Sequence, residues 1–326
     1  MPRLSMIPLL LACALAHAEN RYLQCLQQAL TRAGDEVTVG ELRARCRERS
    51  SRTPPRGNRE TSRIQHRLDA EKLVARSRFG LLPHRTNYVL MAAYDSSPAN
   101  NAPFQEFLDK GVSFQHIEAK FQLSVKTPLA YDLFGVPSGL YLGYTNRSFW
   151  QAYDRGMSSP FRETNHEPEL WLSFYNDWKL FGFRNTVDSI GLSHQSNGRS
   201  GVLSRSWNRI YARFLFEKGN LALEFKPWWR IPESEGNDDN PDIDDYLGYF
   251  ELGGVYKHGG HSFSLLVRNN LRSRDNRGAL QLDWSFPLTR YLRGYLQWFN
   301  GYGESLIDYN HNVNSIGIGI QLTDWL

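Results

Sequence analysis

The sequence predicts an all-β transmembrane protein: residues 81–326 as an antiparallel barrel of about twelve strands, behind a short N-terminal helical and disordered periplasmic extension. Strand-like runs follow one another from Thr86 onward. Apolar and polar side chains alternate along them, as in barrels with one face on lipid and the other on a polar lumen. No run of about eighteen apolar residues follows the N-terminus, so no transmembrane helix is expected. With 326 residues, the chain is long enough for one large β-domain plus an appendage.

The alternation is clearest in three runs. Residues 117–126 place apolar side chains at odd positions and Glu, Lys, Gln or Ser at even ones. Residues 280–286 and 316–322 alternate in the same manner. A buried sandwich could not easily accommodate those lysines and acids, because an unpaired buried charge is costly. We count about twelve such runs, an even number, as a closed bacterial barrel requires.

The N-terminus predicts export. Residues 1–18 combine a short basic region, an apolar core and the small-residue site Ala16-His17-Ala18, which predicts a signal peptide cleaved after Ala18. A rival interpretation is a lipoprotein box ending at Cys13, with Cys13 lipidated, although it leaves a very short apolar region.

Residues 19–80 predict the periplasmic extension. Two short helices are expected within 21–49, and Cys25 and Cys46 either pair between them in an oxidising compartment or remain free thiols. The Arg-rich stretch 43–67 has almost no apolar residues and predicts a disordered linker. That linker is either an arm that contacts anionic lipid or cell-wall polymer, or a solvated tether.

One short unit carries candidate chemistry. His194 and Ser196 lie two residues apart, so on a strand they share a face at a separation of roughly 7 Å. A hairpin with its tip at about Gly201 would put Asn208 opposite His194, close enough for the amide oxygen to hold the imidazole N–H. The three residues predict a Ser-His-Asn hydrolase site.

Side-chain parity predicts that this site faces lipid. His194 shares its face with Ile190 and Leu192, and Asn208 has the parity of Ile210 and Phe214. A water-soluble substrate would find little there, whereas a phospholipid of the outer leaflet could present its ester carbonyl without leaving the bilayer. The topology therefore favours a lipid substrate.

The stretch from Gly191 to Arg209 resembles outer-membrane phospholipase A, whose signature is His-x-Ser-Asn-Gly-Arg-Ser followed by Ser-Arg-Ser-Trp-Asn-Arg. The likeness extends from about Pro83 to the C-terminus, with further blocks in the family's order at 158–165, 226–228, 238–243 and 301–310. The resemblance implies a multi-pass barrel of the bacterial outer membrane. It also implies calcium-dependent phospholipase A1/A2 and lysophospholipase activity, activated by homodimerisation.

The resemblance implies a role for each residue of the catalytic unit. Ser196 attacks the acyl ester, His194 takes the proton and returns it to the leaving group, and Asn208 fixes the imidazole tautomer. The backbone amide of Gly198 contributes to an oxyanion hole. A neutral amide stabilises imidazolium less than the usual Asp does, so the reaction needs another source of electrostatic stabilisation.

Calcium is the cofactor that the resemblance implies. Its ligands would be the carbonyl of Arg199, the hydroxyl of Ser204 and the carbonyl of Ser158 of the partner subunit, with waters completing the shell. The family associates an auxiliary calcium site with an acidic loop that here contains Asp239. The usual partner acid is replaced by Gly201, so the acidic loop is either part of such a site or only a solvated turn.

Asn146 shares the parity of Leu142 and Tyr144, which puts a polar amide on the lipid face. The family has Gln there, which hydrogen-bonds across the dimer interface. The resemblance therefore implies a self-paired dimer contact at Asn146, and a position near the headgroups is the alternative.

Two other functions fit parts of the sequence. A catalytically silent pore or structural barrel fits the inward-facing charges but not a complete Ser-His-Asn set on the lipid side. A barrel adhesin or anchoring module acting through the N-terminal arm fits the two cysteines but none of the catalytic unit. The net charge of +4 is mild and gives no case for nucleic-acid binding.

Overall fold

The computed structural model describes residues 62–74, 80–97, 100–105, 113–156 and 160–324, together with residues 25, 29, 40–43 and 46. The chain divides into two compact units, Met1–Glu60 and Thr61–Leu326. In the first, Cys25 and Cys46 form a disulfide with their Cα atoms 5.6 Å apart, which decides between the two alternatives left open above. The expected signal peptide and Cys13 lie outside the described residues.

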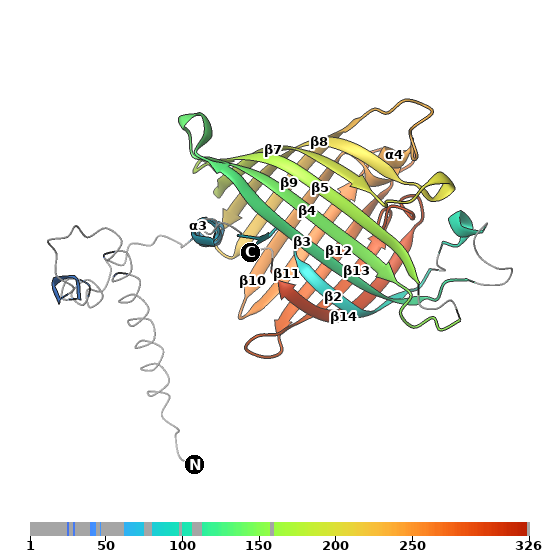
Figure 1. Cartoon of the computed structure of the whole chain (residues 1–326), viewed down its shortest axis with the longest axis horizontal. Helices are drawn as coiled ribbons and strands as arrows, with labels where there is room; N and C mark the ends of the chain where they lie inside the picture. The colour runs from blue at the N-terminus through green and yellow to red at the C-terminus, as the bar shows by residue number, and fades with distance from the viewer. Residues whose placement is uncertain are drawn as a thin grey trace, which may run out of the picture. The chain divides into compact units, whose positions relative to one another are not determined.

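A closed antiparallel barrel makes up the second unit (Figure 1). Strand β14 pairs with β2, β2 with β3, β3 with β4, and the order continues through β5 and β7 back to β14. Among the described residues, twelve long strands form the wall, as predicted: β2 (Asn87–Asp95), β3 (Ile117–Tyr131), β4 (Ser138–Trp150), β5 (Phe161–Tyr175), β7 (Phe183–Ser196), β8 (Ser206–Lys218), β9 (Leu221–Ile231), β10 (Phe250–His258), β11 (His261–Asn269), β12 (Gly278–Pro287), β13 (Arg293–Gly301) and β14 (Val313–Thr323).

Shorter elements precede or connect the twelve long strands. They are the two-residue strands β1 (Leu82–Pro83) and β6 (Lys179–Leu180), the helices α3 (Arg63–Val74) and α4 (Ile243–Leu247), and the 3-10 turns η1 (Ala102–Phe104), η2 (Leu133–Gly135) and η3 (Gly201–Leu203). No helix in the described ranges is long and apolar enough to cross a membrane.

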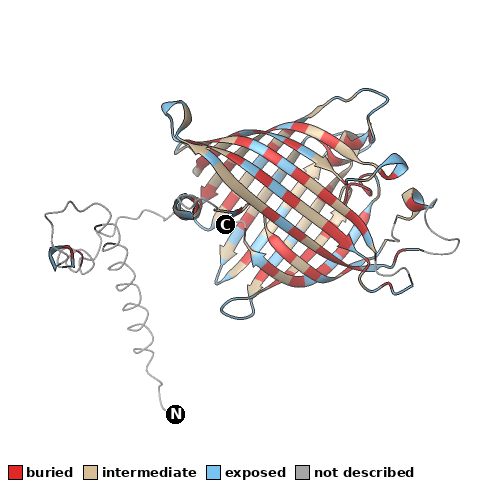
Figure 2. Cartoon of the chain, in the orientation of Figure 1, coloured by how far each residue is buried: buried red, intermediate tan, exposed pale blue. Residues whose placement is uncertain are grey.

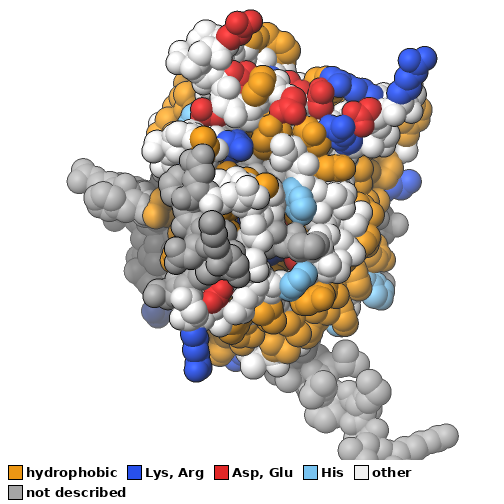
Figure 3. All heavy atoms as spheres, turned by 90° about the vertical axis from the view of Figure 1, so that its right-hand side faces the viewer, with side chains coloured by type: hydrophobic (Ala, Val, Ile, Leu, Met, Phe, Trp, Pro, Cys, Tyr) orange, Lys and Arg blue, Asp and Glu red, His pale blue; other side chains and the backbone are white. Residues whose placement is uncertain are grey.

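Burial alternates along the strands, as the pleat of a strand dictates (Figure 2). On β7, Ile190 and Leu192 are 55% and 51% exposed, whereas Ser189 and Ser193 are buried. Hydrophobic side chains cover the flanks in the end view, and charged ones gather at part of the rim (Figure 3). The apolar face therefore points outward, as predicted for a barrel in lipid.

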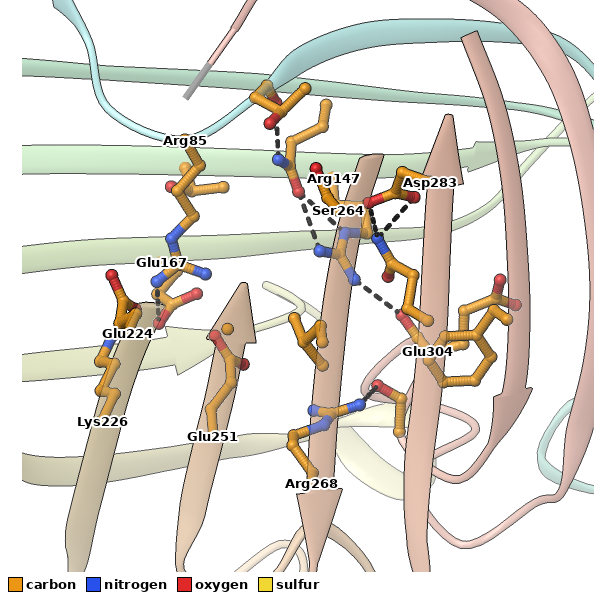
Figure 4. Close-up of a pocket in the computed structure, with 18 of the residues that line it drawn as sticks. Arg85, Arg147, Glu167, Glu224, Lys226, Glu251, Ser264, Arg268, Asp283 and Glu304 are labelled. Atoms are coloured by element: carbon orange, nitrogen blue, oxygen red, sulfur yellow. Dashed lines mark hydrogen bonds and ion pairs between the residues drawn. The ribbon is translucent and has the colours of Figure 1, made fainter. Parts of the chain in front are cut away.

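The interior is held together by ion pairs. Glu167 accepts hydrogen bonds from Arg85 at 3.0 Å and Arg209 at 2.8 Å, and Glu169 pairs with Arg85 and Lys226 at 2.8 and 3.0 Å. Arg85, Glu167, Arg209 and Lys226 line a cavity of about 190 Å³, into which both signs of charge project (Figure 4). Pairing is required here because a buried charge without a partner is strongly destabilising.

Close packing on the inner face supports the strand that carries the candidate site. A Cβ atom added at Gly191 would lie 2.6 Å from the Tyr211 ring and 2.7 Å from Trp171. The absence of a side chain at Gly191 therefore lets two aromatic rings pack directly behind the outward-facing part of β7.

Helix α3 corrects the expected extent of the linker. The composition predicted disorder as far as Arg67, but the helix begins at Arg63, where the Ser62 hydroxyl accepts a hydrogen bond from the Gln65 amide as an N-cap. Ile64, the one large aliphatic residue of that stretch, is 3% exposed and packs in a cluster with Val187, Leu215 and Ala222 of the barrel. A single anchored side chain and a cap thus order residues whose composition is polar.

An ion pair fixes the other end of α3. Glu71 contacts Arg67 and Lys126, both at 2.8 Å. Burial raises the pKa of the Glu71 carboxyl, but the charges of Lys126 and Arg67 outweigh it, so the pKa lies below its ordinary value of 4.5.

We expect Glu71→Gln to lower the free energy of local unfolding of α3 by up to about 3 kcal/mol, because Lys126 keeps its charge and loses its carboxylate partner. The lowered pKa means that the stabilisation is complete above about pH 4.5 and is lost as pH falls through the folded-state pKa. Hydrogen exchange of residues 63–74 measures this. Asp69→Asn, an exposed acid on the same helix, is the control, and equal exchange in both variants would contradict the anchoring role.

Candidate active site

The β7–β8 hairpin brings the first two predicted residues together. His194 stands directly opposite Asn208, and Nδ1 of His194 lies 2.9 Å from Oδ1 of Asn208. Both side chains are on the outer face, since His194 is exposed and its neighbours Ser193 and Arg209 are buried. The hairpin register and the outward parity agree with the geometry expected from the sequence.

Ser196 is the last residue of β7 and shares the face of His194. In the register it stands opposite Ser206 of β8 and His166 of β5. Within the described part of the chain, no hydrogen bond joins Ser196 to His194. Catalytic hydrogen bonds are often long without substrate and tighten in the complex, so the shared face is the relevant observation.

Asn197 organises the loop that follows. Its buried amide donates to the carbonyl of Leu203 at 2.8 Å, and its side-chain oxygen accepts from the backbone amides of Arg205 at 3.0 Å and Arg199 at 3.3 Å. Gly198 follows with φ at +64°, a conformation that glycine adopts without strain. The loop thus holds the Gly198 amide two residues after the nucleophile candidate.

His166 is an outward-facing neighbour of the site. A Cβ added to Gly198 would lie 3.8 Å from its Nε2 and Cδ2 atoms, so the imidazole borders the Gly198 backbone. Nδ1 of His166 lies 2.6 Å from the Tyr144 hydroxyl. The register of β5 against β7 places His166 opposite Ser196. That register was not predicted from the sequence, so His166 was not found there.

Two of the predicted calcium ligands, Arg199 and Ser204, lie on the same loop, and Asp239 reaches it from the loop after β9. The Ser204 hydroxyl donates to Asp239 at 2.7 Å, so a hydroxyl and a carboxylate stand side by side. Arg199 reaches back with its guanidinium to the carbonyl of Arg162 at 2.7 Å. Hydroxyl, carbonyl and carboxylate oxygens are the donors calcium prefers, so this set fits the ion. The expected third ligand, Ser158 of the partner subunit, lies outside the described residues.

The described residues contain no group of three or more His, Cys, Asp or Glu side chains able to hold a metal. A calcium site here would therefore depend on carbonyl and hydroxyl oxygens in addition to Asp239. Gly201, where the family has an acid, has φ at +63° and open space where a side chain would lie.

Asn146 lies on the outer face of β4, beside the site. Its Oδ1 accepts from the Ser148 hydroxyl at 3.1 Å, and its Nδ2 is 3.5 Å from Nδ1 of His166. The amide thus has partners within its own subunit.

Glu233 contacts Asn208, and it was not identified from the sequence. It follows β9, on the loop beyond Ile231, and its carboxylate accepts a hydrogen bond from Nδ2 of Asn208 at 2.9 Å. Ile231 pairs with Asn208 in the register, which brings the start of this loop next to the hairpin.

Fold and site together define an outer-membrane-type barrel that carries a hydrogen-bonded histidine and asparagine beside a serine on its outward-facing wall. Comparison with known proteins gives the family. The phospholipase A1 family model matches residues 64–322, so the chain belongs to the phospholipase A1 family. The barrel and the family establish it as a protein of the bacterial outer membrane.

Similarity to individual proteins supports the same family. The chain is 40% identical over 246 residues to phospholipase A1 of Escherichia coli K12, covering 76% of this chain and 82% of that protein. The E. coli outer membrane phospholipase A structure superposes with a TM-score of 0.71 at 39% identity, over 77% of this chain and 94% of that one. The Salmonella typhi outer membrane phospholipase, solved as a dimer with bound calcium, gives 0.73 at 38% identity, over 79% and 97%.

We expect Asn208→Ala to lower ester hydrolysis less than His194→Ala does. The imidazole remains on the strand when its orienting amide is gone, whereas His194→Ala removes the proposed base itself. The loss in kcat for Asn208→Ala should be smaller than the factor of about 10⁴ found for a charged orienter. Fatty-acid release from mixed micelles measures both variants. Equal inactivity of the two would show that Asn208 does more than orient.

Proposed function

We propose that this protein hydrolyses acyl ester bonds of membrane phospholipids, as a phospholipase A1/A2 with lysophospholipase activity. The outward-facing hydrogen bond between His194 and Asn208 supports this most directly. It stands beside Ser196 and next to the exposed side chains of Ile190 and Leu192, on the face that meets acyl chains. A lipid ester can approach this face laterally within the membrane.

In the proposed mechanism, Nε2 of His194 takes the proton from the Ser196 hydroxyl as Oγ attacks the ester carbonyl carbon. The Nδ1–H stays hydrogen-bonded to Asn208, which keeps the ring in the tautomer that leaves Nε2 free. Collapse of the tetrahedral intermediate breaks the ester C–O bond, and His194 gives the proton to the leaving alkoxide. Water then hydrolyses the acyl-Ser196 by the same steps.

Negative charge develops on the former carbonyl oxygen in each half of the reaction. The backbone amide of Gly198 is the proposed donor to it, because the turn held by Asn197 fixes that amide after the nucleophile. Preorganised donors of this kind lower the barrier because they need no reorientation during the reaction.

Calcium is the proposed cofactor, held by the Arg199 carbonyl, the Ser204 hydroxyl and Ser158 of the partner subunit, with Asp239 as a further candidate. The neighbouring oxygens of Ser204 and Asp239 support it. When bound, a calcium ion supplies positive field near the developing oxyanion.

A homodimer is the proposed active state, because one of the expected ligands comes from the second subunit. Asn146 is the proposed contact across the interface. Residues 1–18 are proposed to leave as a signal peptide, and residues 19–80 to form a periplasmic extension before the domain at 81–326.

We expect Ser196→Ala to abolish fatty-acid release and leave a folded barrel, because Ser196 is on the outer face and supports no interior packing. Ester hydrolysis and the heat-dependent shift in gel mobility are measured on the same sample. Activity near wild type in a folded Ser196→Ala protein would contradict the nucleophile. An inactive wild-type protein would favour the structural barrel instead.

We expect calcium and self-association to be coupled, since an ion bound only by the dimer must tighten the dimer. Without dimerisation, calcium affinity should be weak, because Gly201 supplies no carboxylate and affinity follows ligand charge. Analytical ultracentrifugation in detergent across a calcium titration, with activity in parallel, tests this. Calcium-dependent activity in a strictly monomeric sample would instead move the metal to the loop around Asp239.

A further inference from the structure

We propose that Glu233 is a positioning residue that gives the Ser-His-Asn site its missing negative charge. The proposal rests on the proposed function, because it concerns the same catalytic unit. Two hydrogen bonds of 2.9 Å run in series, from His194 to Asn208 and from Asn208 to Glu233. His194, Asn208 and Glu233 therefore form a chain of three hydrogen-bonded side chains that ends in a carboxylate.

The carboxylate first determines which way the Asn208 amide points. An ionised carboxylate only accepts hydrogen bonds, so the atom of Asn208 that faces Glu233 must be the NH₂ donor. The amide oxygen then faces His194, and an oxygen acceptor requires the proton on Nδ1. Nε2 is then left unprotonated and able to accept a proton. Without Glu233 nothing in this contact pair selects the productive orientation over a flipped amide.

The carboxylate also polarises the amide. A hydrogen bond from Asn208 to a charged acceptor pulls the amide dipole toward Glu233 and increases the negative charge on the oxygen at His194. The imidazolium formed when His194 takes the Ser196 proton is stabilised as a result. Glu233 is half-buried, so water screens part of this effect and the expected contribution is moderate.

Among the residues that the structure describes, the strands beside His194 bring few other titratable groups to it. Asn208 and Ser206 on β8 carry no charge, and β5 contributes His166, which is hydrogen-bonded to Tyr144 of β4. Asp239 contacts Ser204 and Ser206 at the next position along the rim. Glu233 is the carboxylate connected to the imidazole through Asn208.

Removing only the charge is the first test. Glu233→Gln can still accept a hydrogen bond from Asn208, and we expect kcat/KM at pH 8 to fall about 3- to 10-fold. The acid limb of the pH profile should move to lower pH by up to about one unit, since a tenfold change corresponds to one pKa unit. Glu235→Gln, an exposed acid of the same loop, is the matched control.

Moving the charge is the second test. Asn208→Asp alone places a carboxylate against that of Glu233, and like charges at this distance repel, so activity should fall at least tenfold. The double variant Asn208→Asp with Glu233→Gln restores an alternation of donor and acceptor, with the charge now next to His194. We expect it to recover most of the lost activity, a coupling that a purely structural role of Glu233 would not produce.

The imidazole of His194 provides a readout that does not require turnover. NMR of labelled histidine in folded Ser196→Ala protein, with His166→Gln to assign the second ring, should give a lower pKa when Glu233→Gln is added. An unchanged His194 pKa and an unchanged pH profile would overturn the role of Glu233 while Ser196-dependent hydrolysis stands. Absence of Ser196-dependent hydrolysis in the wild-type protein would instead overturn the proposed function.

Discussion

The register between β7 and β8 is the constraint on which the site depends. It places His194 opposite Asn208 and turns both toward the outside of the barrel. Because side chains alternate across a strand, a shift of one residue would turn His194 inward, among the ion pairs around Arg209 and Glu167. The same alternation that makes the wall compatible with lipid therefore also determines which substrate can reach the proposed catalytic unit.

The two faces of the barrel wall are stabilised by different interactions: apolar contact with lipid outside and ion pairing inside. Outward positions such as Leu192 lose nothing by meeting acyl chains, whereas inward positions must satisfy charges by pairing, as Glu169 does with Lys226. This rigid interior, with Tyr211 and Trp171 packed against Gly191, supports a site that has little protein around it on the lipid side. The side chains of the site are therefore held in place by packing on the inner face of β7, rather than by the walls of an enclosing pocket.

Hydrogen bonds along the rim extend this support beyond the strand ends. Asn197 shapes the turn that carries Gly198, and Glu233 restrains Asn208 from the neighbouring loop. Asp239 holds the hydroxyl of Ser204 in the same way. The proposed catalytic unit, with its neutral orienting residue, thus lies next to two carboxylates: Glu233 accepts a hydrogen bond from Asn208, and Asp239 accepts hydrogen bonds from Ser204 and Ser206.

The sequence predicted what depends on short-range periodicity. Alternation over a few residues was enough for the barrel, for the outward parity of His194 and for the pairing of Asn208 across one hairpin. It did not predict α3, because Ile64 is ordered by barrel residues more than a hundred positions away. Glu233 and His166 were missed for a related reason. Their positions depend on loop geometry and on the β5–β7 pairing, which leave no periodic signal.

The central claim is that a serine nucleophile operates from the lipid-facing wall, and active-site labelling in lipid vesicles tests it most directly. A sulfonyl fluoride with a long alkyl chain should modify Ser196 with loss of fluoride, and peptide mass spectrometry should locate the adduct there. A short, charged sulfonyl fluoride should react far more slowly, because it does not partition into the membrane. Equal reaction with the water-soluble reagent, or an adduct at another residue, would contradict the account.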